Sequence, residues 1–189
     1  MRIQVINNIA EEGLKRFGSA YTLVDEEADA LIVRSANLQE MVFEPQLKAI
    51  ARSGVGVNTI PLERCAEQGI VVFNTPGANA NAVKELVVAG LLLASRDISA
   101  AITWTQSLPH DEAIVKTVEQ EKARFQGQEI KGKTLGVVGL GAVGVLVANV
   151  AVQLGMQVLG YDPYISISNA WGLSSKVKRA NSYDDVYRQ

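Results

Sequence analysis

Cysteine and histidine are nearly absent from this sequence, which holds one of each. A single cysteine cannot form an intrachain disulfide, and we predict no metal site in this chain. The spacing of Cys65 from Leu62 and Ala66 places it on the apolar side of a short helix, so we expect a core residue rather than a reactive thiol. His110 stands in a polar, charged stretch, and we expect it on the surface without a catalytic role.

Charge of one sign is not concentrated anywhere in the chain. The sequence has 18 basic and 20 acidic residues, a net charge of −2 and 48% hydrophobic residues. This balance is typical of a soluble globular protein and favours neither a nucleic acid nor an anionic membrane as a partner. The N-terminus enters a strand pattern at once, with no apolar signal segment, so we expect a cytoplasmic protein.

The longest stretch without charge, residues 134–161, lacks the continuity of a membrane span. A spanning helix needs about 20 predominantly apolar residues, whereas glycines and amide side chains interrupt this stretch. A buried strand with its covering helix explains the stretch better. The apolar run 86–94 is too short to span a membrane and predicts a buried helix.

A glycine-rich motif, G-x-G-x-x-G, lies between an apolar strand pattern at 134–138 and an apolar helix pattern at 145–154. Glycines at this spacing allow a tight turn, a close approach to a pyrophosphate and close packing of the helix on its strand. Free N–H groups at the start of the helix would face the phosphates. The motif residues predicted to bind the cofactor are Gly139, Gly141, Ala142, Val143 and Gly144.

An acidic residue follows the next predicted strand, 157–161, at the place that a dinucleotide-binding fold requires. Asp162 lies about 20 residues beyond the glycine motif, where a carboxylate accepts hydrogen bonds from the adenosine ribose. It would also repel a 2′-phosphate, and residues 163–165 include no arginine to offset it. The sequence therefore predicts NAD rather than NADP, with Tyr161, Asp162 and Pro163 at the cofactor.

Strand and helix patterns alternate along the chain, which is typical of a parallel α/β protein. We expect strands at 2–7, 21–24, 30–34, 48–52 and 70–73, and helices near 9–17, 60–68 and 80–97. The last of these helices would link a first domain, residues 1–98, to a dinucleotide-binding domain, residues 99–189. Between them, residues 104–125 form a charged helical excursion that predicts a dimer arm.

Five segments together resemble the signature series of the D-2-hydroxyacid dehydrogenases. They are RSGVGVN (52–58), GIVVFNTPGAN (69–79), VKEL (83–86, followed by Arg96), GKTLG (132–136) and GYDP (160–163). The resemblance covers essentially the whole chain. It implies a flavodoxin-like substrate-binding domain, followed by the first half of a Rossmann NAD-binding domain.

The resemblance also implies which residues hold the substrate. Arg34 and Ser35 follow an apolar strand, at the strand end where open α/β sheets bind ligands. In the family the matching arginine meets a substrate phosphate, and the alternative is an ordinary surface arginine. Asn79 matches an asparagine beside the substrate, although it could equally be a helix N-cap.

Gly54, Val55 and Gly56 follow another strand, and the resemblance implies that their backbone N–H groups hold the substrate carboxylate. The alternative is a simple tight turn. Val55 and Val83 are also predicted to lie at the cofactor.

Two residues depart from the family pattern. Val145 stands where a basic residue is common, which leaves the pyrophosphate to backbone amides and the helix dipole. Lys84 stands where alanine is common, and the sequence suggests no role for it.

In the family, an arginine, a glutamate and a histidine carry out the reaction, and we find no match to these three in the 189 residues. We therefore predict no catalytic residue within this chain, and no dehydrogenase activity from a polypeptide ending at Gln189. Residues 181–189 match the helix that precedes the fourth strand of the nucleotide sheet. Without that strand, the glycine-rich strand 135–139 would lie at an exposed apolar edge.

Three functions remain open from the sequence. The first is NAD-dependent oxidation of a phosphorylated 2-hydroxyacid, with a homodimer or higher oligomer as the expected assembly. The second is the same reaction on glyoxylate, lactate or a similar acid. The third is a non-catalytic NAD-binding protein.

Overall fold

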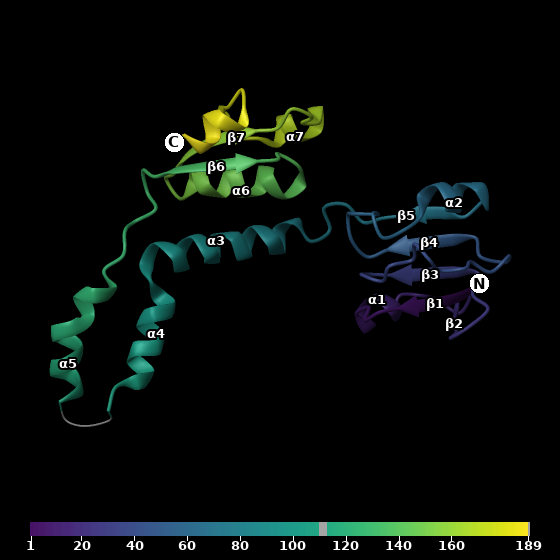
Figure 1. Cartoon of the computed structure of the whole chain (residues 1–189), viewed down its shortest axis with the longest axis horizontal. Helices are drawn as coiled ribbons and strands as arrows, with labels where there is room; N and C mark the ends of the chain where they lie inside the picture. The colour runs from purple at the N-terminus through teal and green to yellow at the C-terminus, as the bar shows by residue number, and fades with distance from the viewer. Residues whose placement is uncertain (110–112, 189) are drawn as a thin grey trace. The chain divides into compact units, whose positions relative to one another are not determined.

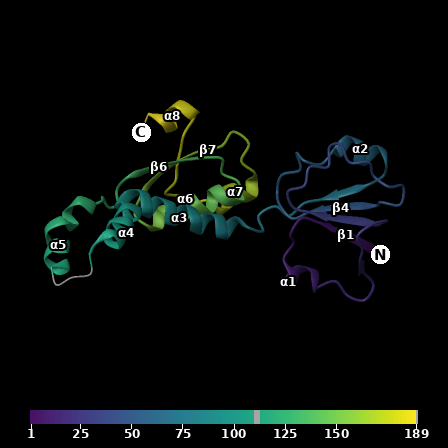
Figure 2. The same ribbon diagram turned by 60° about the horizontal axis from the view of Figure 1, so that its bottom comes forward.

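The computed structural model describes residues 1–109 and 113–188, which form two compact units, Met1–Asn79 and Ala80–Gln189. Figure 1 and Figure 2 show the elements of each unit. The two units are described separately below. His110, which we expect on the surface, lies outside the described residues.

The first unit contains a five-stranded parallel sheet with the strand order β2-β1-β3-β4-β5. This is the flavodoxin-like order of open α/β sheets, which confirms the predicted fold class. Its strands are β1 (Arg2–Ile6), β2 (Thr22–Leu23), β3 (Ala30–Val33), β4 (Ala49–Arg52) and β5 (Val71–Phe73). Each lies within a stretch that the sequence pattern predicts as a strand.

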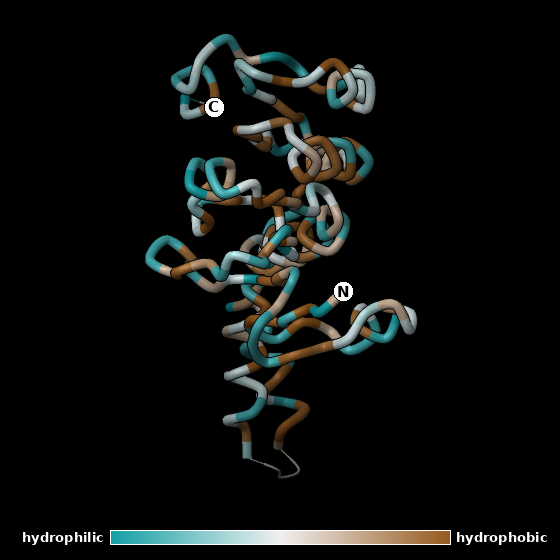
Figure 3. Tube along the Cα trace, turned by 90° about the vertical axis from the view of Figure 1, so that its right-hand side faces the viewer, coloured by the Kyte–Doolittle hydropathy of each residue, from teal (hydrophilic) through white to brown (hydrophobic). Residues whose placement is uncertain are grey.

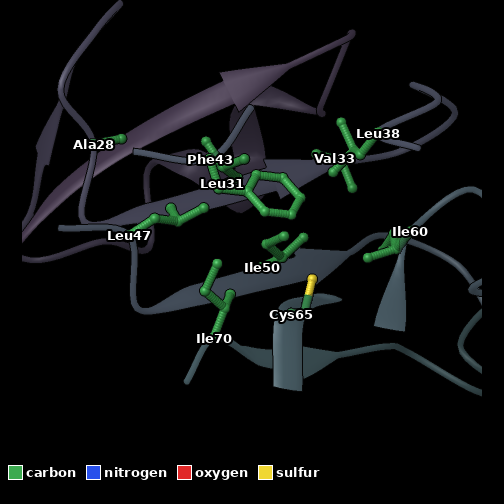
Figure 4. Close-up of a cluster of buried hydrophobic side chains, with 10 residues drawn as sticks. All are labelled: Ala28, Leu31, Val33, Leu38, Phe43, Leu47, Ile50, Ile60, Cys65 and Ile70. Carbon is green, nitrogen blue, oxygen red and sulfur yellow. The ribbon is translucent and has the colours of Figure 1, made fainter. Parts of the chain in front are cut away.

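The core of the first unit forms around the central strands β3 and β4. Val33 and Ile50 are completely buried because they lie on the face of the sheet that packs against the core cluster, as the register Leu31↔Ile50 and the alternation of side chains indicate. Helices α1 (Glu11–Leu14) and α2 (Leu62–Glu67) are both shorter than the sequence pattern predicts. Figure 4 shows ten residues of this core, namely Ala28, Leu31, Val33, Leu38, Phe43, Leu47, Ile50, Ile60, Cys65 and Ile70.

Cys65 extends from α2 into this core and is 1% exposed, which confirms the prediction of a core residue. Burial raises the pKa of the thiol, because the charged thiolate loses its hydration there. We expect the folded protein to react with a disulfide reagent far more slowly than the denatured protein at mildly alkaline pH. Rapid labelling of the native protein would show that the thiol is accessible.

The second unit contains a three-stranded parallel sheet of β6 (Thr134–Val138), β7 (Gln157–Tyr161) and β8 (Lys178–Arg179), in that order. Helix α6 (Ala142–Gln153) covers one face, and α8 (Tyr183–Tyr187) packs on the other (Figures 1 and 2). Strand β6 lies at the edge of this sheet, as the sequence predicts, and Val138 is 47% exposed. The β6–α6–β7 unit is the first part of a Rossmann fold.

Helix α3 (Ala80–Arg96) packs against α6, and Val87 and Leu91 lie against the core of the second unit. The chain therefore divides before α3, at Asn79, whereas the sequence places the boundary at its end, near residue 98. The physical reason is that the inward side of α3 is apolar and needs the apolar α6 to cover it.

The excursion predicted at 104–125 is helical. It comprises α4 (Ile98–Ser107), α5 (Ile114–Glu121) and the 3-10 helix η1 (Lys122–Phe125). The rings of Trp104 and Phe125 lie 5.0 Å apart and join α4 to η1. Neither α4 nor α5 contributes a buried residue among those that the structure describes.

Hydrophobic and hydrophilic segments alternate along the trace in Figure 3. Within residues 1–109 and 113–188, no single helix is long and apolar enough to cross a membrane, and only the pair α3 and α4, bent by 64°, meets the length and composition together.

Candidate functional site

A cavity of about 320 Å³ lies at the carboxyl ends of the strands in the first unit. The chain segments that follow β1, β3, β4 and β5 all reach it, because parallel strands end at the same edge of a sheet. Its lining consists of Asn8, Ile9, Ala10, Arg34, Ser53, Gly54, Thr75, Ala78 and Asn79.

Arg34 supplies the positive charge of this cavity. It directly follows β3 and is exposed, and its guanidinium makes no ion pair or hydrogen bond within the described part of the chain. The loop that carries it is held by Asn7, whose Oδ1 accepts the N–H groups of Ser35 at 3.1 Å and Ala36 at 2.8 Å. A positioned but unpaired guanidinium is suited to binding a phosphate or a carboxylate.

The glycine segment after β4 is anchored to the segment after β5. The Gly54 N–H donates to Thr75 Oγ1 at 2.8 Å, and the Thr75 N–H donates to the Gly54 carbonyl at 2.9 Å. Among the described residues, the N–H groups of Val55 and Gly56 have no hydrogen-bond partner. Two neighbouring free N–H groups can donate hydrogen bonds to an anion. The predicted carboxylate site requires such groups.

The alternative interpretation, a simple tight turn, explains why residue 56 is a glycine. A Cβ at Gly56 would lie 3.1 Å from Arg52 Nη1 and 3.2 Å from Asn58 Oδ1, so a side chain would crowd both groups. Packing within the chain therefore accounts for Gly56. It does not account for the unpaired N–H groups.

The structure brings three predicted residues, Arg34, Gly54 and Asn79, to one cavity. Gly56 instead lines a larger open cavity nearby, and Ser35 and Val55 are exposed beside the Arg34 cavity without lining it. Residues 8–10, which follow β1, also line the cavity and were not predicted. Their position after a strand is the signal that could have indicated them.

In the second unit, the glycine motif takes the geometry that its spacing predicts. Gly139 has φ +88°, a conformation that favours glycine, and its N–H donates to the Tyr161 carbonyl at 2.8 Å. A Cβ at Gly144 would lie 1.9 Å from the Gly139 carbonyl oxygen, so no side chain fits there. A Cβ at Gly141 would meet nothing within 4 Å, so the protein itself leaves that space open.

Helix α6 begins at this open space without a side-chain cap. Gly141 is its N-cap residue and provides no side chain to satisfy the first N–H groups. Those groups and the positive end of the helix dipole are therefore available to an anion. Val145 is buried in the core and adds no charge at the start of α6.

Asp162 is held in a fixed orientation at the end of β7. Its Oδ2 accepts the Leu140 N–H at 2.8 Å, and its Oδ1 accepts the Tyr164 N–H at 2.8 Å. A carboxylate has about four lone-pair sites, so each oxygen can accept one more hydrogen bond. This arrangement suits the two hydroxyls of a ribose.

A cavity of about 420 Å³ lies beside Asp162 within the second unit. Three predicted cofactor residues, Tyr161, Asp162 and Pro163, line it together with Leu140 of the glycine loop. Lys178 and Arg179 of β8 also line this cavity, and no local sequence pattern predicts either of them there. The open space at Gly141, the uncapped helix and the oriented carboxylate fit a dinucleotide.

Two further residues of interest, Lys84 and Val83, lie on α3. Lys84 Nζ donates to Asn81 Oδ1 at 2.5 Å, and Asn81 Nδ2 donates to Glu85 Oε1 at 2.8 Å, so Lys84 belongs to a polar network on one helix. Val83 is half-buried, and its place at the cofactor stays a prediction. No cluster of metal-ligating side chains occurs in the described ranges.

Comparison with known proteins identifies the family of this chain. The family described as "D-isomer specific 2-hydroxyacid dehydrogenase, catalytic domain" matches residues 14–180. The D-3-phosphoglycerate dehydrogenase of Methanocaldococcus jannaschii is 42% identical over 143 residues, which is 74% of this chain and 25% of that protein. The hydroxypyruvate reductase of Thermotoga maritima is 41% identical over 140 residues, which is 72% of this chain and 42% of that protein.

A solved structure supports the fold assignment. The NAD⁺-bound 3-phosphoglycerate dehydrogenase of Entamoeba histolytica has a TM-score of 0.68 and 26% identity, and the match covers 99% of this chain and 59% of that one. Its bound NAD⁺ agrees with the predicted cofactor. The chain spans about a quarter of the length of the archaeal relative. On the family match and the similarity to these relatives, the chain belongs to the D-isomer-specific 2-hydroxyacid dehydrogenase family.

Proposed function

We propose that this chain contributes substrate and NAD binding to an enzyme that oxidises 3-phospho-D-glycerate to 3-phosphohydroxypyruvate, a step of serine biosynthesis. The observation that carries the proposal is the cavity at the strand ends of the first unit, which Arg34, with its unpaired guanidinium, and Gly54 both line. Relatives that bear the name D-3-phosphoglycerate dehydrogenase support the choice of substrate.

Each binding group has a distinct task in this proposal. Arg34 binds the substrate phosphate, and the free N–H groups of Val55 and Gly56 bind the substrate carboxylate. Asp162 binds the adenosine ribose, and the uncapped start of α6 binds the pyrophosphate. NAD supplies the acceptor for the hydride. We assign proton transfer to no residue of this chain.

The test of this function is the effect of Arg34→Ala on two substrates. Losing one partner of a hydrogen-bonded charge pair costs about 2–5 kcal/mol when the pair is buried by ligand. We therefore expect kcat/KM for 3-phosphoglycerate to fall at least about 30-fold in the intact protein. Activity with D-glycerate or 2-hydroxyglutarate should change little, because these acids have no phosphate. Calorimetric titration of 3-phosphoglycerate measures the same loss without turnover.

Arg16→Ala is the matched control, because Arg16 is an exposed arginine of the same unit that does not line the cavity. It should leave both substrates unaffected. An equal loss with phosphorylated and unphosphorylated acids in Arg34→Ala would mean that Arg34 supports the fold or the carboxylate site. The substrate assignment would then be wrong.

A hydroxypyruvate reductase is the second candidate, because the Thermotoga maritima relative is nearly as similar. That enzyme type would use the same carboxylate site without a phosphate. Full retention of kcat/KM in Arg34→Ala, with hydroxypyruvate as the better substrate, would favour it.

We also propose that the protein works in the cytoplasm as a homodimer or higher oligomer. Ile98 and Ile102 of α4 are 37% and 52% exposed, and a cavity of about 330 Å³ lies between this helix and Phe125. A second copy that covered these apolar side chains would remove them from water. Sedimentation analysis of wild type and Ile102→Asp should show a dimer and a monomer, respectively.

A further inference from the structure

Arg179 lines the same cavity as Asp162, although 17 positions of chain separate the two residues. It is the last residue of β8, and its backbone is held in place because the next N–H, that of Ala180, donates to the Gly160 carbonyl at 2.9 Å. Residues 163–165, which follow Asp162 directly in the sequence, include no positively charged residue. Arg179 supplies a positive charge from β8, the strand that pairs with β7.

The strand register places Arg179 on the cofactor face of the sheet. Arg179 pairs with Gly160 of β7, and Asp162 lies two residues beyond Gly160. Side chains alternate along strands, so these positions share a face. A Cβ at Gly160 would lie 3.1 Å from Leu140 Cδ1, which identifies that face as the one covered by the glycine-rich loop.

The guanidinium of Arg179 is available to a ligand. Arg179 is exposed and forms no ion pair in the part of the chain that the structure describes, even with Asp162 in the same cavity. Both oxygens of Asp162 are oriented by backbone N–H groups instead. The cavity therefore has one acidic residue, Asp162, and two basic residues, Arg179 and Lys178, in its lining.

We propose that Arg179 is a second determinant of cofactor specificity, which attracts the 2′-phosphate of NADPH and partly offsets its repulsion by Asp162. The inference rests on the proposed dinucleotide-binding function. A phosphate group has a charge of about −1.5 to −2 at neutral pH, and a guanidinium can bind it through two parallel hydrogen bonds. NADH remains the preferred cofactor because only its ribose offers both hydroxyls to Asp162. The ratio of NADH affinity to NADPH affinity is therefore smaller than Asp162 alone would produce.

The experiment is a calorimetric titration of the intact wild-type protein, Arg179→Ala and Lys176→Ala with NADH and with NADPH. We expect Arg179→Ala to raise the Kd of NADPH about tenfold. The loss of affinity is smaller than for a buried charge pair, because Arg179 is exposed and water screens its charge. The Kd of NADH should change less than about twofold. Lys176→Ala removes the same charge from an exposed residue outside the cavity and should shift neither Kd.

Two further variants test the geometry. Arg179→Lys should recover part of the NADPH affinity, because it keeps the charge and loses the planar fork. Lys178 also lines the cavity but pairs with Leu159, one register position before the Arg179–Gly160 pair. Because side chains alternate along a strand, Lys178→Ala should weaken NADPH binding less than Arg179→Ala does. A larger loss of NADPH binding in Lys178→Ala than in Arg179→Ala would overturn the assignment.

The remaining outcomes separate this inference from the proposed function. Wild type could bind NADH while Arg179→Ala raises the Kd of NADH and of NADPH by the same factor, or changes neither Kd. In that case Arg179 does not recognise the 2′-phosphate, and only the inference fails. If wild type binds neither cofactor, the proposed function fails together with the inference. Thermal unfolding of each variant shows whether the fold is retained.

Discussion

Replacing Gly144 with alanine is expected to abolish useful NADH binding, with a loss of affinity of at least about 100-fold. The added Cβ would lie 1.9 Å from the Gly139 carbonyl oxygen, so the glycine-rich loop must move away from the start of α6. Displacing binding groups by about 1 Å can cost about 100-fold. Overpacking of this kind also destabilises the fold by about 1–3 kcal/mol. Titration of NADH fluorescence and thermal unfolding measure the two effects.

Gly141→Ala is the matched control, because a Cβ there meets nothing within 4 Å. Its thermal stability should equal that of wild type, whereas NADH binding should weaken, since the methyl group enters the space proposed for the pyrophosphate. Wild-type NADH affinity in both variants would show that this loop does not contact the cofactor. Loss of stability in Gly141→Ala would contradict the open space that the structure shows.

Asp162→Ala is expected to weaken NADH binding about 10- to 150-fold, because hydrogen bonds to a charged group contribute about 1.5–3 kcal/mol. NADPH should lose less affinity or gain it, because the repulsion of its 2′-phosphate disappears. The preference of wild type for NADH should therefore shrink or reverse. Parallel fluorescence titrations with both cofactors measure the ratio.

The Asp162 side chain also accepts the N–H groups of Leu140 and Tyr164, so its removal could loosen the loop. Asp162→Asn keeps an oxygen acceptor and should retain more NADH affinity than Asp162→Ala. Asp184→Ala, at an exposed carboxylate of α8, serves as the charge control. Equal affinity of wild type for NADH and NADPH would refute the role assigned to Asp162.

Apolar runs and the turn residues between them predict the strands well, because strands in a parallel sheet are short and end at turns. The β3 run Ala30–Val33 and the β6 run Thr134–Val138 are examples. The glycine motif likewise predicts its local structure, since the spacing of its glycines follows from the geometry of one strand–helix turn. The lengths of α1 and α2 were overestimated, because local patterns do not show where tertiary contacts end.

Residues that meet only through the sheet were not predictable from local patterns. Arg179 reaches the cavity of Asp162 because β8 pairs with β7, and no sequence spacing reveals that pairing. The same holds for the domain boundary. The pattern of α3 shows an apolar helix, but only its packing on α6 assigns it to the second unit.

The packing of α3 on α6 has a consequence for synthesis on the ribosome. All five strands of the first sheet lie within residues 1–79, so that unit can fold as soon as it emerges. Helix α3 emerges next, but α6 begins only at Ala142, and translation at about 5–20 residues per second delays it by several seconds. During that interval Val87 and Leu91 have not yet met α6, so the nascent chain exposes an apolar side of α3 that a chaperone could cover.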